Sequence, residues 1–344
     1  PLISNPDGAC PDWDPLAYAI QAAHERGLQL HAYFNTHTIW GSATAPNIAN
    51  YPTHVYHTHP EWRLHDDVGN PLGYTVARWD NLGTGAPNDG PGNPDNLGWD
   101  AFMRDCVTRQ VINICGEAWS IDPTVVMSSA PLGLRVATDY PGYSTGFFYG
   151  YPRAQDAFAW LTMGGQDFVV PQIYWFDSGT DPDFSDVYPP WQAHANSVGR
   201  GLVAGARNGV NTGIDGNLTV AQRQAYNEAQ ALQARASGAM GYNLWHVADT
   251  LFTDWSAAGH PYENPAPVPG YPWRSTESVI VGRVYSGDGT TPVTDAWITR
   301  NGTSWTALSS GDGFYCFLRV PPGTYTVSAT HPAYGTAQVT GVTT

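Results

Sequence analysis

The segment DFVVPQIYWFD, residues 167–177, combines the two features from which we infer the fold. It begins with the apolar run Phe168, Val169 and Val170, which is typical of a strand covered on both faces. Ligands of parallel α/β folds bind at the carboxyl ends of the strands, so we expect a binding cleft where this segment ends. The polar and aromatic side chains at that end are Gln172, Tyr174, Trp175 and Asp177.

The composition favours a glycan as the ligand and argues against two other partners. Of the 344 residues, 42% are apolar and 13% are charged, while tryptophan and tyrosine occur 14 and 19 times. Many aromatic rings and few charges are common in proteins that stack sugar rings. The net charge is −15 and every basic residue is arginine, which argues against nucleic acid or an anionic membrane surface. No stretch is long and apolar enough to span a bilayer.

Helical and strand-like patterns alternate along residues 1–259. Apolar residues at Leu16, Ala19, Ile20 and Ala23 have helical spacing. Such alternation implies a parallel sheet with helices outside it, and five strand units are the larger part of an eight-fold barrel. We therefore predict an α/β fold, a (β/α)8 TIM-type barrel that is incompletely represented in this chain. Further helices are expected over 97–120, 152–163, 190–197 and 219–236, and strands over 28–34, 124–130, 167–175, 201–207 and 239–246.

The pattern changes after residue 259, where a second, smaller domain is expected. Residues 260–277 are rich in proline and predict an extended, fairly stiff linker. In residues 278–344 the apolar period becomes two, which predicts a small all-β sandwich. Its strands are expected over 279–285, 296–300, 314–320 and 323–330.

Two further features concern the chain as a whole. Residues 40–96 lack periodicity, and a loop of that length is either a functional lid or a stretch from which something is missing. The chain begins at Pro1 without a methionine or a signal peptide, as a processed secreted protein or a partial sequence would. The four cysteines favour buried free thiols, because Cys106 and Cys115 share a predicted helix and lie too far apart on it to pair.

Five segments, taken together and in order, resemble the glycosyl hydrolase-like family 10 proteins. They are AAHERGLQLHAYFN (22–35), HPEW (59–62), SIDPTVVMSSAPLG (120–133), DFVVPQIYW (167–175) and GAMGYNLWHV (238–247). The resemblance implies a (β/α)8 barrel of the bacterial cell envelope that acts on glycan strands, including peptidoglycan freed of its peptides. Residues 282–298 and 310–335 resemble a carboxypeptidase regulatory-like (prealbumin-like) domain, which implies an accessory module.

The chain departs from the family pattern in a way that matters for catalysis. The family has two strands before the first one here and a fourth strand with a DG-x-H-x-D-like motif, and neither is found. The fourth strand belongs near Pro71 and Leu72, so it has been lost or the sequence omits it. A barrel without three strands could not close, which favours omission. The resemblance places a catalytic aspartate in that motif, so its role cannot be transferred to a residue here.

Glycoside hydrolysis needs two carboxyl groups, one on each side of the scissile bond. Asp177 and Asp249 lie just past predicted strand ends, on the face where catalytic residues are expected, and are the candidates. The alternative for each is a loop aspartate or a helix cap.

Substrate contacts are expected from the same strand ends and from the segments of the resemblance. Tyr174 and Trp175 cannot both face the cleft, because side chains alternate along a strand. His31 could equally be a core histidine, a structural lid corner is the alternative for His59 and Glu61, and barrel packing is the alternative for the aromatic residues. The candidates are His31, Asn35, His59, Glu61, Gln172, Tyr174, Trp175, Trp245 and His246.

We expect no metal and no cofactor. His54, His57 and His59 lack the spacing of a zinc site and have no obvious further ligand. The sequence thus predicts an extracellular or cell-surface glycoside hydrolase acting on a polysaccharide or peptidoglycan-type glycan. The alternative is a non-catalytic glycan-binding or structural surface protein, with self-association through the carboxyl-terminal sandwich.

Overall fold

The computed structural model describes residues 15–27, 30–32, 47–58, 95, 97–144, 146–179, 182–207, 218–245, 255–264 and 267–344. The chain divides into two compact units, Pro1–Arg78 and Trp79–Thr344. The first unit contains α1, Pro15–His24, as its apolar spacing predicted, and the short α2, Val55–Thr58. Leu30, His31 and Ala32 are exposed and lie outside any strand, unlike the expected strand over 28–34.

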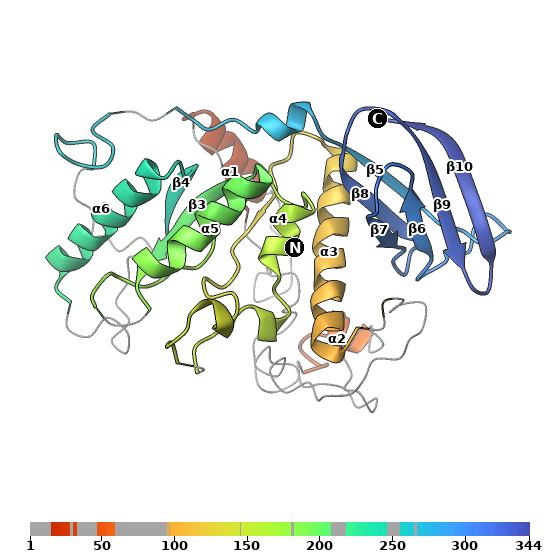
Figure 1. The fold of residues 1–344 in the computed structure, drawn as a ribbon, viewed down its shortest axis with the longest axis horizontal. Helices are drawn as coiled ribbons and strands as arrows, with labels where there is room; N and C mark the ends of the chain where they lie inside the picture. The colour runs from red at the N-terminus through yellow and green to blue at the C-terminus, as the bar shows by residue number, and fades with distance from the viewer. Residues whose placement is uncertain are drawn as a thin grey trace. The chain divides into compact units, whose positions relative to one another are not determined.

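A four-stranded parallel sheet forms one half of the second unit (Figure 1). Its strands are β1, Ser128–Ser129; β2, Phe168–Val169; β3, Gly201–Arg207; and β4, Gly241–Trp245, in that spatial order. The helices between them are α4, Ala157–Thr162; α5, Phe184–Val198; and α6, Val220–Ala236. The predicted α/β alternation with a parallel sheet is confirmed over residues 128–245, and closure into a barrel stays a prediction.

One face of this sheet is apolar, is buried from solvent and packs against the helices. Leu202 and Ala204 of β3, Trp191 of α5 and Ala234 of α6 belong to a single buried apolar cluster. The sequence pattern finds most of these elements because apolar residues mark their buried faces. It begins α5 at residue 190, whereas the helix starts at Phe184 and contains two prolines. Both prolines lie on exposed positions, where water can satisfy the carbonyl groups that lose their helical partners.

Antiparallel strands form the other half of the second unit. They are β5, Ser278–Arg283; β6, Trp297–Arg300; β7, Thr306–Leu308; β8, Phe314–Val320; β9, Thr324–His331; and β10, Gly335–Thr343. One sheet has the order β10-β9-β6-β7 and the other pairs β5 with β8. Ile280, Ile298 and Phe317 are buried in one core cluster of this half. The expected strands are present, and β7 and β10 are additional.

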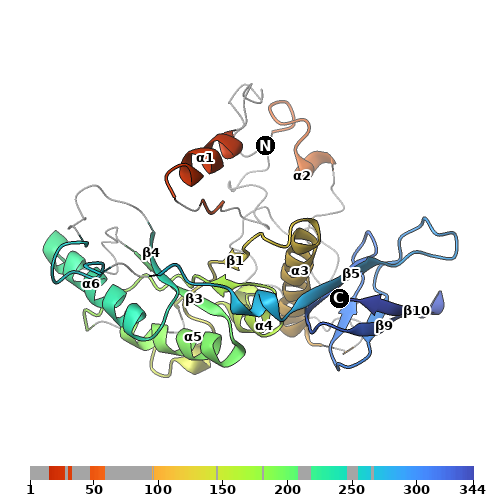
Figure 2. The same cartoon turned by 90° about the horizontal axis from the view of Figure 1, so that it is seen from above.

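Strand β8 is buried on both of its faces. Phe317 and Val320 belong to the core of the antiparallel half, whereas Phe314, Cys316 and Leu318 form a second cluster with Ile112 of helix α3, Trp99–Ile121. Figures 1 and 2 show α3 standing between the two halves, with β5 running beside it. The antiparallel half is therefore docked on α3 through an apolar interface.

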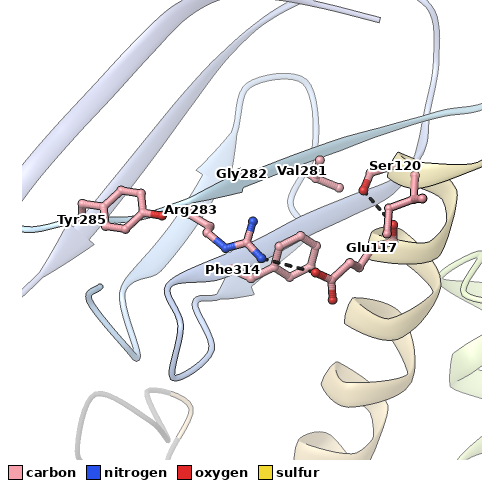
Figure 3. Close-up of a pocket in the computed structure, with 8 residues that line it drawn as sticks. Glu117, Ser120, Val281, Gly282, Arg283, Tyr285 and Phe314 are labelled. Carbon is pink, nitrogen blue, oxygen red and sulfur yellow. Dashed lines mark hydrogen bonds and ion pairs between the residues drawn. The ribbon is translucent and has the colours of Figure 1, made fainter. Parts of the chain in front are cut away.

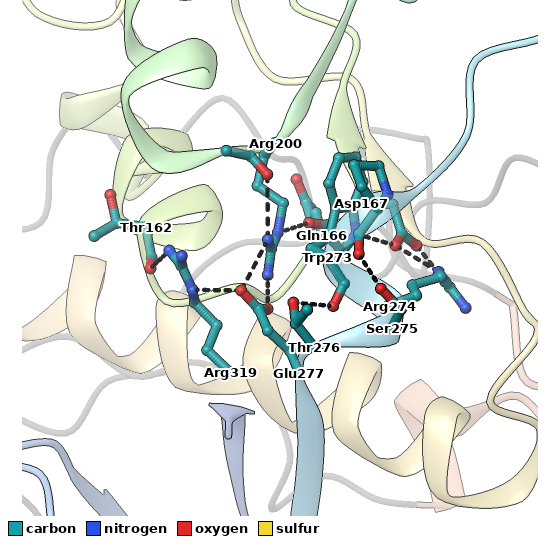
Figure 4. A network of polar contacts seen from close by, with 12 residues as sticks. Thr162, Gln166, Asp167, Arg200, Trp273, Arg274, Ser275, Thr276, Glu277 and Arg319 are labelled. Carbon is teal, nitrogen blue, oxygen red and sulfur yellow. Dashed lines mark hydrogen bonds and ion pairs between the residues drawn. The ribbon is translucent and has the colours of Figure 1, made fainter. Parts of the chain in front are cut away.

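A polar network completes this interface and involves the expected linker (Figure 4). Pro272–Ser275 form a 3-10 turn, and Trp273 and Arg274 both donate hydrogen bonds to Asp167, at the amino end of β2. Arg200, which is 6% exposed, pairs with Glu277, and Glu277 also accepts a hydrogen bond from Arg319. The sequence predicted an extended linker over residues 260–277. This end of it instead contains a 3-10 turn whose side chains bond to the parallel sheet.

The thiols within the described part of the chain are free. Cys106 and Cys115 lie on α3, as predicted, and Cys316 lies on β8. Burial raises the pKa of Cys115 far above its ordinary value and that of Cys316 to about 12. None of the described helices combines the length and the apolar character that crossing a membrane requires.

Candidate functional site

The site is built on the face of the parallel sheet that points away from the helices. Val169, Ile173, Leu202 and Ala204 are core residues under the helices, so their neighbours along each strand point the opposite way. The hydroxyl of Tyr242 on β4 bonds to Asn227 and Gln230 of α6, which fixes the direction of that strand too. We call the opposite surface the polar face; at the carboxyl ends of the strands it carries Gln172, Tyr174, Arg207, Asn243 and Trp245.

Tyr174 and Trp245 form an aromatic pair on the polar face. Their ring centroids are 6.3 Å apart and their planes differ by 28°, and Trp245 is 44% exposed. Arg207 lies level with Trp245 in the register of β3 and β4. Two nearly parallel rings, one of them accessible, with an arginine beside them, can stack against the apolar side of a sugar ring and bond to its hydroxyl groups.

Gln172 is positioned by the neighbouring strand rather than projecting freely. Its Nε2 donates a 2.7 Å hydrogen bond to the carbonyl of Ala130, and its backbone bridges to Leu132 and Gly205. This contact uses one amide proton and orients the side chain at the strand end. The amide oxygen is the group with which Gln172 would contact a ligand.

Trp175 does not belong to the polar face. It packs against the main core, and its carbonyl accepts a 2.9 Å hydrogen bond from Gln230 of α6. Its indole Nε1 is buried without a hydrogen-bond partner among the described residues. Of the two aromatic residues, Tyr174 lies on the polar face beside Trp245 and Trp175 does not.

Asp177 follows the strand end and stabilises the start of the next helix. Its Oδ1 accepts a 2.8 Å hydrogen bond from the backbone of Ser185, in the first turn of α5. Such a contact satisfies a helical N–H group that has no partner within the helix. The N-cap residue is Asp183, so Asp177 caps the helix from a preceding loop, in keeping with the alternative named for it, and its catalytic role stays a prediction.

The other candidates divide into two groups. His31 is exposed in the first unit, and its placement relative to the polar face is not defined. Asn35, His59, Glu61, His246 and Asp249 lie outside the described residues. Among the described residues no three histidine, cysteine, aspartate or glutamate side chains gather as a metal site would require.

Sequence reasoning missed Arg207 and Asn243, which share the polar face with the predicted residues. The signal was present, because GLVAGAR and GYNLW place polar residues at or near strand ends. It also missed the contact between Tyr143 and Asp186, 3.0 Å apart, which joins the loop after β1 to the first turn of α5. Among the polar-face positions from 170 to 174, 203 to 207 and 241 to 245, none is a carboxylate.

Comparison with known proteins finds distant relatives. The chain, which has a parallel α/β sheet with aromatic rings at its carboxyl ends, is similar to curated proteins named glycosyl hydrolases. The glycosyl hydrolase YngK of Bacillus subtilis is 26% identical over 322 residues, covering 79% of this chain and 61% of that protein. The glycosyl hydrolase DigH of Escherichia coli K12 is 24% identical over 234 residues, covering 56% and 53%. No family model matches the chain.

The alignments cover only part of each relative. The chain spans about half to three fifths of the length of these relatives. The alignment with YngK runs over 322 positions but includes only 79% of the 344 residues here, about 270. About 50 positions within the matched region of YngK therefore have no counterpart in this chain.

Proposed function

We propose that the protein hydrolyses glycosidic bonds in a polysaccharide or peptidoglycan-type glycan, which it binds at the polar face. The aromatic pair of Tyr174 and Trp245 at the carboxyl end of a parallel sheet carries this proposal. Carboxyl ends of strands are where α/β enzymes place their ligands. The names of the distant relatives support the same class of activity.

The proposed fold of the complete catalytic part is a (β/α)8 barrel. Four strands in sequential parallel order with helices on one face are half of such a barrel. The positions of YngK that have no counterpart here are numerous enough for a further strand and its loops. We propose an extracellular or cell-surface location, which the resemblance to cell-envelope proteins supports.

The proposed chemistry uses two carboxyl groups, one of which protonates the leaving oxygen. Asp249 follows β4 in the chain and is our candidate for one of them, while the second belongs to the segment expected near Pro71. Gln172 and Arg207 would hold hydroxyl groups, and the aromatic pair would stack against the sugar ring. These roles assign binding to the described part of the polar face and proton transfer to Asp249 and to the segment expected near Pro71.

The test is release of reducing ends from a panel of neutral polysaccharides and from peptidoglycan stripped of its peptides. We expect activity on at least one substrate, at least 100-fold lower in Asp249→Asn, since general acid–base groups contribute about 10²–10⁴-fold. Asp295→Asn, in the antiparallel half, is the control. No product from any substrate would overturn the enzymatic proposal.

A non-catalytic glycan-binding protein is the second candidate, because Asp177 is engaged in helix capping and no described strand position on the polar face is a carboxylate. Glycan retention without hydrolysis, weakened by Trp245→Ala, would favour it. An uninterrupted coding sequence from Pro71 to Leu72 would favour it as well.

Self-association through the antiparallel half is also proposed, with a second copy of the chain as the partner. Strand β10 lies at the edge of its sheet, is exposed along most of its length and contains no charged residue. Uncharged edge strands can pair with another strand, and lysine on such a strand opposes this. We expect a dimer by light scattering that Val339→Lys converts to a monomer; a monomeric parent protein would contradict this proposal.

A further inference from the structure

A pocket of about 390 Å³ opens where the carboxyl end of α3 meets β5 and β8 (Figure 3). Glu117, Ser120 and Ile121 of α3 line one wall, and Arg283, Tyr285 and Phe314 line the other. The volume lies within the roughly 300–1,000 Å³ of small-ligand sites. We propose that this pocket is a second saccharide-binding site that takes a neutral sugar unit of a glycan chain.

The charges in the pocket favour a neutral ligand. The guanidinium of Arg283 lies 3.3 Å from Glu117 and 3.2 Å from Asp312, so one positive group is shared by two carboxylates. An anion would meet the excess negative charge, and a cation would have to compete with Arg283 for the same oxygens. Hydroxyl groups can instead donate to the carboxylate oxygens and accept from arginine N–H groups without disturbing the ion pairs.

A sugar ring has an apolar side as well as hydroxyl groups, and the apolar walls of the pocket are suited to that side. Tyr285 is 46% exposed and Ile121 is 81% exposed, and the partly buried Val281 of β5 also lines the pocket. In Figure 3 Arg283 lies between Tyr285 and Glu117, so an accessible ring stands beside alternating donors and acceptors. Phe314 is buried beneath the guanidinium, 5.3 Å from it, and holds Arg283 in place. This combination of a ring and fixed polar groups is the common composition of saccharide sites.

The location separates this pocket from the polar face. Helix α3 ends at Ile121 and the chain then enters β1, so the end of α3 lies toward the amino ends of the parallel strands. The polar-face aromatic pair lies at the opposite, carboxyl ends. A glycan bound in the pocket would be held by the protein without occupying the proposed catalytic cleft. The assignment rests on the pocket alone and does not require hydrolysis.

The experiment measures binding to the full chain by isothermal titration calorimetry. The probes are hexasaccharides of glucose, mannose, xylose and N-acetylglucosamine, applied to Trp245→Ala so that the polar face is weakened. We expect at least one hexasaccharide to bind this variant, and Tyr285→Ala added to it to weaken that binding at least 10-fold. Glu117→Gln should weaken it as well, since it removes a charged acceptor. Tyr334→Ala, at a tyrosine that is 59% exposed elsewhere in the antiparallel half, is the control.

Two outcomes would overturn the inference. One is the absence of binding of every hexasaccharide to Trp245→Ala at millimolar concentration. The other is binding that Tyr285→Ala and Glu117→Gln leave unchanged although both variants keep the parent melting temperature. Reducing-end release from a short soluble substrate should be the same in Tyr285→Ala and in the parent protein. Absence of hydrolysis with saccharide binding in the pocket would contradict only the proposed function. Hydrolysis without binding in the pocket would contradict only the second saccharide site.

Discussion

The two ends of the segment 167–177 illustrate different uses of the same strand. At the amino end, Asp167 is 1% exposed and accepts four hydrogen bonds, from Met127, Trp273 and twice from Arg274. At the carboxyl end, Tyr174 is only half-buried and faces the exposed Trp245. Parallel α/β folds commonly place stabilising contacts at the amino ends of strands and ligand contacts at the carboxyl ends. Changes at the two ends should therefore affect different properties.

The largest effect on stability is expected at Asp167. Asp167→Ala leaves the Arg274 guanidinium without its carboxylate partner and Trp273 Nε1 without its acceptor. Removing one partner of a buried ion pair costs about 3–5 kcal/mol. We expect that loss in the free energy of unfolding measured by urea denaturation, and less than about 0.5 kcal/mol for the exposed Asp100→Ala. Equal stability of the two variants would show that the network in Figure 4 does not anchor the antiparallel half.

A somewhat smaller effect is expected where β8 meets α3. Leu318 is 3% exposed within the cluster that joins the two halves, and Leu318→Ala would leave a cavity there. We expect a loss of about 2–4 kcal/mol in the free energy of unfolding, with a single transition for both halves. Leu232→Ala, at a position 49% exposed on α6, is the control. Two separate unfolding transitions in the parent protein would contradict a shared interface.

His194 is expected to make stability depend on pH, with a smaller effect than the loss of the ion pair at Asp167. The imidazole stacks on Phe158 with centroids 3.9 Å apart, and burial lowers its pKa below the ordinary value. Because the unfolded chain then binds the proton more readily, stability should fall as pH drops below about 6.5. His194→Gln should flatten melting temperature against pH between 7 and 5 relative to the parent, whereas the exposed His24→Gln should not. An unchanged slope in His194→Gln would count against this origin.

The smallest effect on stability, and the largest on binding, is expected at Trp245. Its exposed ring contributes little to the core, so Trp245→Ala should change the free energy of unfolding by less than about 1 kcal/mol. Glycan affinity measured by calorimetry should fall about 10-fold or more, since an aromatic contact contributes roughly 0.5–1.5 kcal/mol beyond its buried area. Trp305→Ala, 37% exposed in the antiparallel half, is the control. If Trp245→Ala lowered stability but not glycan affinity, the carboxyl end would serve stability rather than binding, contrary to the comparison with Asp167.

The sequence predicted elements where one pattern dominated and failed where tertiary contacts decided. The alanine- and glutamine-rich composition of residues 219–236 located α6 closely, and the apolar period of two after residue 277 located β8 closely, because local sequence alone indicates these elements. Local sequence could not foresee that Pro189 and Pro190 fit inside α5, since that depends on which side of the helix faces water. The capping role of Asp177 was named only as an alternative, because a carboxylate after a strand looks the same whether it binds substrate or a backbone N–H group.

The candidate site was predicted in part for the same reason. Tyr174 and Trp245 were found because aromatic residues at strand ends are conspicuous, and the structure brings them together. Arg207 and Asn243 were missed because their importance depends on which face of each strand is covered by helices. The docking of the carboxyl-terminal half was not foreseen either, since Phe314, Cys316 and Leu318 look like ordinary sandwich residues until α3 lies against them.

The burial of β8 against α3 has a consequence for synthesis on the ribosome. Cys316 contacts the backbone of Ile112, 204 residues earlier, and Arg274 reaches Asp167 across 107 residues. At a translation rate of about 5–20 residues per second, α3 waits on the order of ten seconds or more for its covering strand to emerge. During that time its apolar surface and the Asp167 carboxylate lack their final partners. Nascent chains stopped before residue 270 should therefore engage chaperones, although they already contain β1, β2, β3 and β4.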